Sequence, residues 1–134
     1  MKFGRLDHIA IEVEDFEGRI AQLVDTGAVR VIRYGTGGAG QRLAVLGDGT
    51  GVKIEIAEAA GAVEPRFLHF AFRSDDVDGA RETLIEQGWQ HKFGPKHIPP
   101  AQCYTAMLTD GTGFDLQVIS YEETAPDIAE WKAE

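Results

Sequence analysis

The chain has 134 residues, 43% of them hydrophobic and 26% charged, so we expect one globular domain, 1–134. A formal net charge of −9 argues against a nucleic-acid partner, because binding to a phosphate backbone needs a cationic surface. No apolar run reaches the roughly 20 residues that span a bilayer, and no signal-peptide core is visible. We therefore expect a cytoplasmic protein without a membrane partner. One cysteine, Cys103, excludes an intrachain disulfide.

An internal repeat divides the chain into two halves. Residues 6–27 align with residues 67–88 at an offset of 61 (67 minus 6), which places His69 on His8. The tetrapeptide DGTG follows in each half, beginning at Asp48 and at Asp110. Two copies of so long a repeat indicate a duplicated module within one domain, not a solenoid.

Hydrophobic alternation and helical periodicity predict the order β-α-β-β-β in each half. In the first module, 5–58, we expect a strand at 5–13, a helix at 16–26 and strands at 29–34, 42–47 and 52–58. In the second module, 66–120, we expect a strand at 67–73, a helix at 76–87 and strands at 90–94, 103–109 and 114–120. The proline-containing segment 94–102 is expected to be a loop. The tail, 121–134, is expected to be helical near 124–132, with Ile128 and Trp131 on one apolar edge.

The alternation of side chains across a strand separates an apolar face from a polar one. The polar face carries two histidines, a glutamate and a glutamine at repeat-equivalent places: His8, Glu55, His69 and Gln117. Two imidazoles, a carboxylate and a carboxamide oxygen are a suitable ligand set for a divalent first-row transition metal. The same face also carries Glu12, Lys53, Arg73 and Asp115.

The chain resembles the vicinal oxygen chelate superfamily, which includes glyoxalase I, methylmalonyl-CoA epimerase, bleomycin-resistance proteins and extradiol dioxygenases. The resemblance covers about 5–120 and rests on LDHIAIEVEDFE, FLHFAFRSDDVDGARETLIEQG and the two DGTG turns. Its opening is most similar to methylmalonyl-CoA epimerases and glyoxalase-like proteins. The resemblance implies an α+β fold in which two βαβββ modules form a curved, mostly antiparallel cup with the helices outside.

The resemblance also implies a site and an assembly. It assigns metal-ligand roles to His8, Glu55, His69 and Gln117, around one divalent ion of zinc, nickel, cobalt, manganese or iron. It further implies a homodimer. Metal-binding members often have a carboxylate where this chain has Gln117, and an amide cannot accept a proton. We therefore expect Glu55 to be the catalytic base, with Glu12 or Asp115 as neighbours.

Arg73 has two interpretations on this face. It could bind a substrate carboxylate, as a residue lining a substrate cup together with Glu12 and Asp115. The alternative is a salt bridge between Arg73 and Glu12, which occupy equivalent positions in the two halves.

Three functional hypotheses follow. The first is a metal-dependent lyase or isomerase that stabilises an enediolate of a small 2-oxo or acyl thioester substrate, as in glyoxalases and epimerases. The second is an iron-dependent, extradiol-type dioxygenase that uses the facial triad His8, His69 and Glu55. The third is a metal-free small-molecule binding or antibiotic-resistance protein. Each has a small molecule as its ligand.

Overall fold

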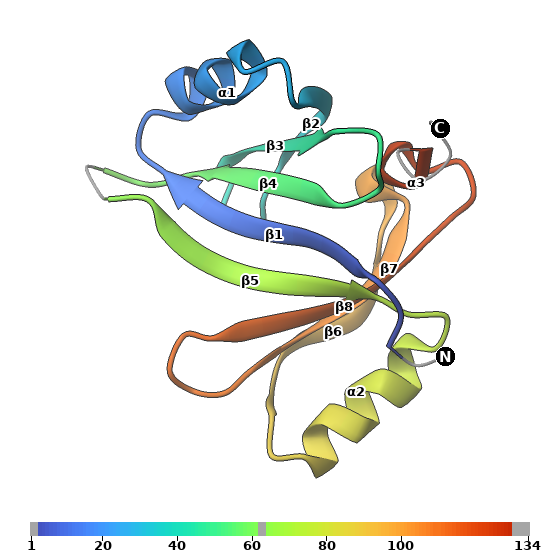
Figure 1. Cartoon of the computed structure of the whole chain (residues 1–134). Helices are drawn as coiled ribbons and strands as arrows, with labels where there is room; N and C mark the ends of the chain where they lie inside the picture. The colour runs from blue at the N-terminus through green and yellow to red at the C-terminus, as the bar shows by residue number, and fades with distance from the viewer. Residues whose placement is uncertain (1–2, 62–63, 130–134) are drawn as a thin grey trace.

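The structure, a computed structural model, describes residues 3–61 and 64–129 (Figure 1). The elements of the first half are β1 (Leu6–Val13), α1 (Phe16–Asp25), β2 (Arg30–Thr36), β3 (Arg42–Gly47) and β4 (Lys53–Glu58). Those of the second half are β5 (Arg66–Arg73), α2 (Val77–Glu86), β6 (Gln90–Ile98), the 3-10 turn η1 (Pro99–Ala101), β7 (Cys103–Thr109) and β8 (Asp115–Tyr121). A short helix, α3 (Pro126–Ala129), follows.

The eight strands form one curled sheet in the order β2-β3-β4-β1-β5-β8-β7-β6 (Figure 1). The two halves meet where β1 pairs with β5 in antiparallel fashion, and β1–β4 and β5–β8 are the two parallel pairs. The other pairs are antiparallel. The predicted α+β cup of two βαβββ modules is therefore confirmed, with α1 and α2 on the outer side of the sheet.

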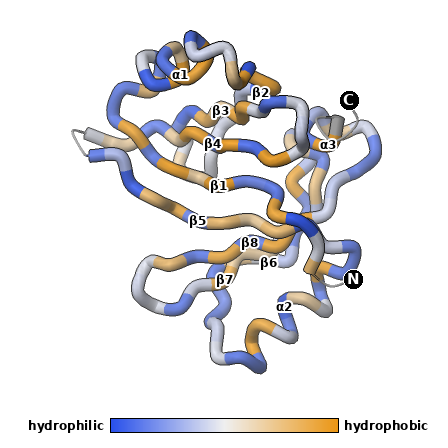
Figure 2. The backbone as a smooth tube through the Cα atoms, in the orientation of Figure 1, coloured by the Kyte–Doolittle hydropathy of each residue, from blue (hydrophilic) through white to orange (hydrophobic). Residues whose placement is uncertain are grey.

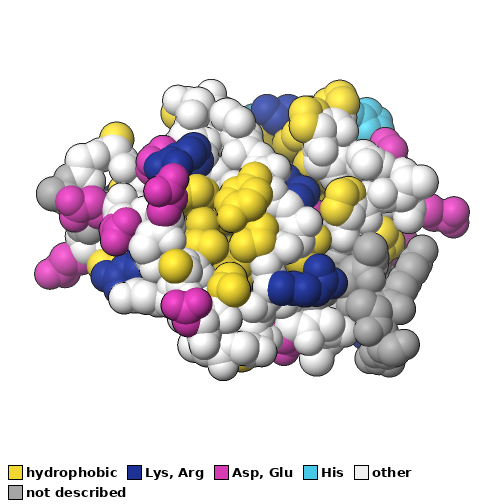
Figure 3. All heavy atoms as spheres, turned by 90° about the horizontal axis from the view of Figure 1, so that it is seen from above, with side chains coloured by type: hydrophobic (Ala, Val, Ile, Leu, Met, Phe, Trp, Pro, Cys, Tyr) yellow, Lys and Arg dark blue, Asp and Glu magenta, His cyan; other side chains and the backbone are white. Residues whose placement is uncertain are grey.

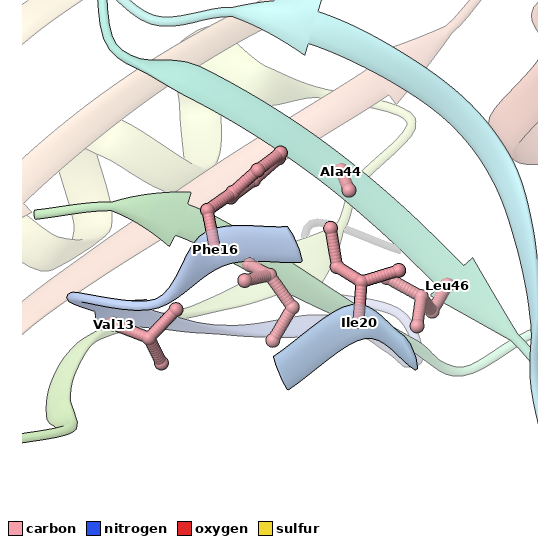
Figure 4. Close-up of a cluster of buried hydrophobic side chains, with 6 residues drawn as sticks. Val13, Phe16, Ile20, Ala44 and Leu46 are labelled. Carbon is pink, nitrogen blue, oxygen red and sulfur yellow. The ribbon is translucent and has the colours of Figure 1, made fainter. Parts of the chain in front are cut away.

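Helix α1 packs its apolar face on the outer side of β3 and β4. The helix begins after Asp15, whose carboxylate accepts a hydrogen bond from the backbone nitrogen of Gly18 at 3.1 Å, a typical N-cap. The buried cluster beneath it consists of Val13, Phe16, Ile20, Ala44, Leu46 and Ile56 (Figure 4). Because Ile56 faces this cluster, the neighbouring side chain in the strand, Glu55, faces the opposite side of the sheet.

Helix α2 repeats this arrangement in the second half. Asp76 caps it by accepting a hydrogen bond from the backbone nitrogen of Gly79 at 3.0 Å. The cluster beneath it consists of Val77, Ala80, Leu84, Ala106, Leu108 and Val118. Figure 2 shows the resulting alternation of hydrophobic and hydrophilic residues along the strands. The two cores lie outside the cup, so the inner face of the sheet is available for polar side chains.

Strand β6 differs from the sequence prediction. It runs through Pro95 to Ile98, where a loop was expected from residue 94 onward. The strand lies at the edge of the sheet, and a proline without an N–H group is tolerated there. The pairing with β7 is irregular between Phe93 and Lys96, which accommodates the proline. The prediction of a loop was therefore wrong for 94–98, whereas 99–102 forms the 3-10 turn η1 and its C-cap.

The tail after β8 turns back to β2. Helix α3 packs against β2, which confirms a helix within the predicted 124–132. Trp131 and the rest of 130–134 lie outside the described residues. Among the described residues, no helix is both long enough and apolar enough to cross a bilayer.

An apolar groove lies on the outer surface, away from the cup. Its volume is about 750 Å³, and it runs between α1 and the strands β2 and β3, with Ile20, Val24 and Leu43 in its wall. Figure 3 shows hydrophobic side chains gathered on the face that carries α1, with charged side chains around them. The predicted ligands His8, Glu55 and His69 do not line it.

Candidate metal centre

Three of the four predicted metal ligands meet on the inner face of the sheet, here called the cup face. The Nε2 atom of His8, on β1, lies 3.2 Å from Oε2 of Glu55 on β4. It also lies 3.2 Å from Nε2 of His69 on β5. One ligand atom from each residue lies within 4.8 Å of the other two. His8, Glu55 and His69, here called the ligand trio, therefore have the chemistry and the proximity that a divalent transition metal requires.

Strand register explains why these side chains converge. Ala10 of β1 is opposite Glu55 in the parallel pair with β4 and opposite His69 in the antiparallel pair with β5. Paired residues point to the same face of a sheet. Ala10 is fully buried, and its single methyl group separates the two ligands without filling the space between them. His8, two residues earlier on the same strand, completes the trio.

Gln117 occupies the equivalent position in the second half. Ala71 is opposite both His8 and Gln117, just as Ala10 is opposite both His69 and Glu55. Gln117 is buried, and its Nε2 donates a hydrogen bond to Oγ1 of Thr105 at 2.8 Å. Its side chain is therefore held by a neighbour on the cup face. Its role as a fourth ligand stays a prediction.

Asp7 is a functional candidate that sequence alternation did not identify. Simple alternation would place Asp7 on the face opposite to His8. The pairing of β1 with β5 is irregular between Leu6 and His8, and an irregularity of this kind redirects a side chain. Oδ2 of Asp7 accepts a hydrogen bond from Nδ1 of His8 at 2.7 Å. This contact directs the other ring nitrogen, Nε2, into the trio, as a carboxylate behind a metal-binding histidine does.

A buried network holds Asp7 in place. Nζ of Lys53 donates to Oδ1 of Asp7 at 2.9 Å and to the carbonyl oxygen of Gly51 at 3.1 Å. The hydroxyl of Tyr121 donates to Oδ2 of Asp7 at 2.6 Å. The side chains of Asp7 and Lys53 are both fully buried. Burial would raise the pKa of Asp7, but the hydrogen bond and charge of His8, with the charge of Lys53, lower it to about 2.

The two imidazoles of the trio have opposite pKa shifts. Burial by itself would lower the pKa of His8, but hydrogen bonds to Asp7 and Glu55 outweigh it and raise the pKa to about 9. Burial would raise the pKa of Glu55, but the hydrogen bond and charge of His8 lower it to about 2. Burial and the charge of His8 together lower the pKa of His69 to about 4. At neutral pH, His8 therefore carries a proton and His69 does not.

Glu12 and Arg73, predicted to line the substrate cup, do not pair with each other. Glu12 forms an ion pair with Arg66, which is opposite it in the antiparallel register of β1 and β5. Arg73 lies at the other end of β5, and its guanidinium carbon is 5.6 Å from the centre of the Tyr121 ring. The predicted salt bridge between Glu12 and Arg73 is therefore wrong. Because β1 and β5 are antiparallel, the C-terminal residues of the two strands lie at opposite ends of the pair. Their roles toward a substrate stay predictions.

Asp115, the third residue predicted to line the cup, is opposite His69 in the pairing of β5 with β8. Its Oδ2 accepts a hydrogen bond from Nζ of Lys92. Among the described residues, no hydrogen-bond partner is found for its buried Oδ1 atom. The carboxylate does not join the ligand trio. Its negative charge raises the pKa of His69 against the stronger effects of burial and of His8.

Strand alternation did not identify a further cation on the cup face, Arg33. Arg33 of β2 forms a two-bonded ion pair with Asp127 of α3: Nε to Oδ1 at 2.6 Å and Nη2 to Oδ2 at 3.1 Å. The charge of Arg33 contributes to the low pKa of Glu55. The partners are 94 residues apart in the chain, and a contact of such separation has no local signal in the sequence.

Sequence comparison assigns the family. Residues 7–106 match the Glyoxalase/Bleomycin resistance protein/Dioxygenase superfamily. The chain belongs to this superfamily. The match confirms the resemblance drawn from the two histidine-bearing strands and the repeated turns. No curated protein sequence matches the chain.

Solved structures of superfamily proteins share the fold. Methylmalonyl-CoA epimerase from Mycobacterium tuberculosis is 19% identical, with a TM-score of 0.76 over 90% of this chain and 89% of that chain. A variant of the Streptomyces coelicolor methylmalonyl-CoA epimerase, solved with 2-nitronate-propionyl-CoA, is 18% identical, with a TM-score of 0.74 over 92% and 98%. At these identities the comparison establishes the common architecture and not the reaction.

Proposed function

We propose that this protein is a metal-dependent lyase or isomerase of the glyoxalase type, acting on a small 2-oxo or acyl thioester substrate. The observation that carries the proposal is the convergence of the trio's ligand atoms within 4.8 Å. His8, Glu55 and His69 would hold the ion, with Gln117 as the predicted fourth ligand. A bound divalent ion would supply the Lewis acidity that stabilises negative charge on two adjacent substrate oxygens.

Glu55 is our candidate for the group that moves the substrate proton. Its side chain is 18% exposed, whereas that of His8 is 5% exposed, so the carboxylate is the more accessible of the two. Oε2 is the oxygen that meets His8. The hydrogen bond and charge of His8 outweigh burial and lower the pKa of Glu55 to about 2, so at neutral pH the carboxylate is deprotonated and able to accept a proton. A positioned base of this kind contributes roughly 10²–10⁴-fold to a rate.

Asp7 and Lys53 support the trio from behind. The carboxylate of Asp7 fixes which nitrogen of His8 faces Glu55, and Lys53 fixes the carboxylate. Neither group needs to touch a substrate for this role. The rigidity of a buried, fully paired network would keep His8 oriented while the substrate changes.

The test combines metal analysis with isotope exchange. Protein purified without chelator should contain about one equivalent of a transition metal, and the double variant His8→Ala, His69→Ala should lose it. Metal-loaded protein should exchange the acidic C–H of methylmalonyl-CoA or of a methylglyoxal hemithioacetal with deuterated water. Glu55→Gln should abolish exchange. Glu58→Gln is the matched control, since Glu58 lies on the same strand but pairs with Arg42 on the outer side.

A metal-free protein that takes up no added metal would overturn this proposal and would favour the binding-protein hypothesis. The same two histidines and one carboxylate also form the ligand pattern of iron-dependent dioxygenases, which makes the dioxygenase our second candidate. Oxygen consumption with a catechol, dependent on ferrous iron and absent with other metals, would select it. The homodimer stays a prediction, and sedimentation of the purified protein would test it.

A further inference from the structure

Arg33 lies on the same row of the sheet as the ligand trio. Arg33 is opposite Val45 in the β2–β3 pair, and Val45 is opposite Glu55 in the β3–β4 pair. Because opposite residues share a face, Arg33 belongs to the cup face, two strands from Glu55. Strands are spaced by about 4.8 Å, so the backbone of Arg33 lies roughly 10 Å from that of Glu55. A small substrate could span this distance.

The Arg33 guanidinium already forms an ion pair with a carboxylate of the same chain. Asp127 contacts it through both oxygens, the geometry in which arginine recognises a free carboxylate. The Asp127 side chain is 3% exposed and that of Arg33 is 20% exposed, so the pair is largely enclosed. Asp127 comes from the four-residue helix α3, outside both modules. The sheet therefore contributes the cation, and the tail contributes the anion.

The second module has no equivalent of this cation. The row that repeats Arg33, Val45 and Glu55 consists of Phe93, Met107 and Gln117. Another cation of the cup face, Lys53, is fully buried behind His8 and held by Asp7. Arg33 differs from Lys53 in that its carboxylate comes from the short terminal helix. It is therefore a cation of the cup whose partner could be exchanged without opening the sheet.

We propose that Arg33 binds a carboxylate of the substrate, and that Asp127 is the internal group that this carboxylate displaces. The inference rests on the proposed function, because the trio must hold the other end of the substrate. It narrows the substrate class to molecules with two adjacent metal-binding oxygens at one end and a carboxylate at the other. In this arrangement the ion pair between Arg33 and Asp127 holds α3 against the empty cup. The carboxylate of the correct substrate replaces Asp127 in that ion pair.

The test uses two probes that share a metal-binding end. Acetohydroxamate chelates a metal ion through two adjacent oxygens, and the monohydroxamates of succinate and glutarate add a carboxylate at increasing distance. Titrated into the zinc-loaded protein, the better-fitting carboxylate probe should bind about 10- to 100-fold more tightly than acetohydroxamate, as expected for a charge-assisted contact. Arg33→Gln should remove this margin while changing the affinity for acetohydroxamate by a much smaller factor.

The two members of the ion pair should have opposite effects, and this distinguishes binding from structural support. Asp127→Asn removes the competing charge, so it should increase the margin for the carboxylate probe several-fold although it lowers the melting temperature. Arg42→Gln is the matched control: Arg42 also pairs with a carboxylate of a neighbouring element, Glu58, but lies on the outer side. It should change neither affinity.

The outcomes separate the two proposals. If Arg33→Gln and Asp127→Asn weaken both probes alike, the ion pair is a structural contact and the inference is wrong. If the carboxylate probes bind no better than acetohydroxamate, Arg33 does not bind a substrate carboxylate, but the proposed metal site is still supported. If acetohydroxamate does not bind the zinc-loaded protein, the proposed metal site falls first and the inference with it.

Discussion

Metal binding should release about one proton at pH 8, because His8 must lose its proton before it can become a ligand. With a pKa of about 9, about nine-tenths of His8 would be protonated at pH 8; at the ordinary value of 6.5 the fraction would be about 3%. The pKa values of Glu55 and His69, about 2 and about 4, leave both groups deprotonated at that pH. The released proton therefore reports on His8.

The sign and size of the effect follow from this proton. Between pH 4 and pH 9 the competing proton weakens metal binding, so the affinity should rise about tenfold for each pH unit and level off above pH 9. From pH 6 to pH 8 the gain would be about 100-fold, or about 2.7 kcal/mol. In the metal-free protein, the same raised pKa stabilises the fold below pH 6.5, and this contribution is lost as the pH rises through 9.

Calorimetry measures the proton directly. Zinc is titrated in buffers of different ionisation enthalpy at pH 8, and the slope of observed heat against that enthalpy gives the number of protons released. Asp7→Asn should reduce this number, because the pKa of His8 falls when the negative charge beside it is removed. A proton from metal-bound water would appear in both proteins and cancel in the difference. Asp48→Asn, in the first DGTG turn, is the control and should leave the number unchanged. Equal release from wild type and Asp7→Asn would refute the role assigned to Asp7.

Three further predictions concern packing and support of the cup. Lys53→Met should destabilise the protein by about 3–5 kcal/mol in urea unfolding, since it removes one of the two cations that contact the buried Asp7 carboxylate and leaves only His8; a change below about 1 kcal/mol would contradict a buried ion pair. Ala10→Val should weaken zinc binding at least tenfold, because it adds two methyl groups between Glu55 and His69. Unchanged affinity would show that Glu55 and His69 do not bind the ion on either side of Ala10. Ile56→Ala should cost about 2–5 kcal/mol of unfolding free energy without changing zinc affinity, because its side chain faces α1; a loss of zinc binding in folded protein would contradict the separation of core and cup.

The fold could be predicted because the repeat doubles every signal. A strand, a capped helix and three further strands occur in the same order twice, so each half supports the interpretation of the other. Alternation then placed His8, Glu55 and His69 on one face. Their convergence depends on which strands are neighbours, and that information came from the family resemblance. The structure confirms it through the central pairing of β1 with β5.

The supporting residues could not be predicted in the same way. Asp7 reaches His8 only because the strand pairing is irregular at this point, and Lys53 looked like one more polar residue until its complete burial was known. Arg33 and Asp127 depend on where the tail packs, which no periodicity encodes. Position along a strand can be inferred from sequence, whereas the partner that a buried charge finds across the fold cannot.

The two halves meet at the pairing of β1 with β5, called here the seam, and both belong to one chain. This arrangement affects how the site can evolve. If two identical half-length chains met along this seam, every substitution would appear twice, once on each side of the two-fold axis. A single polypeptide is free of that constraint. One half can keep Glu55 while the other carries Gln117, and one can place Arg33 where the other has Phe93. Fusion of the two halves into one chain therefore allows a symmetric cup to become an asymmetric binding site. One end can bind the ion, and the other can bind the far end of an asymmetric molecule.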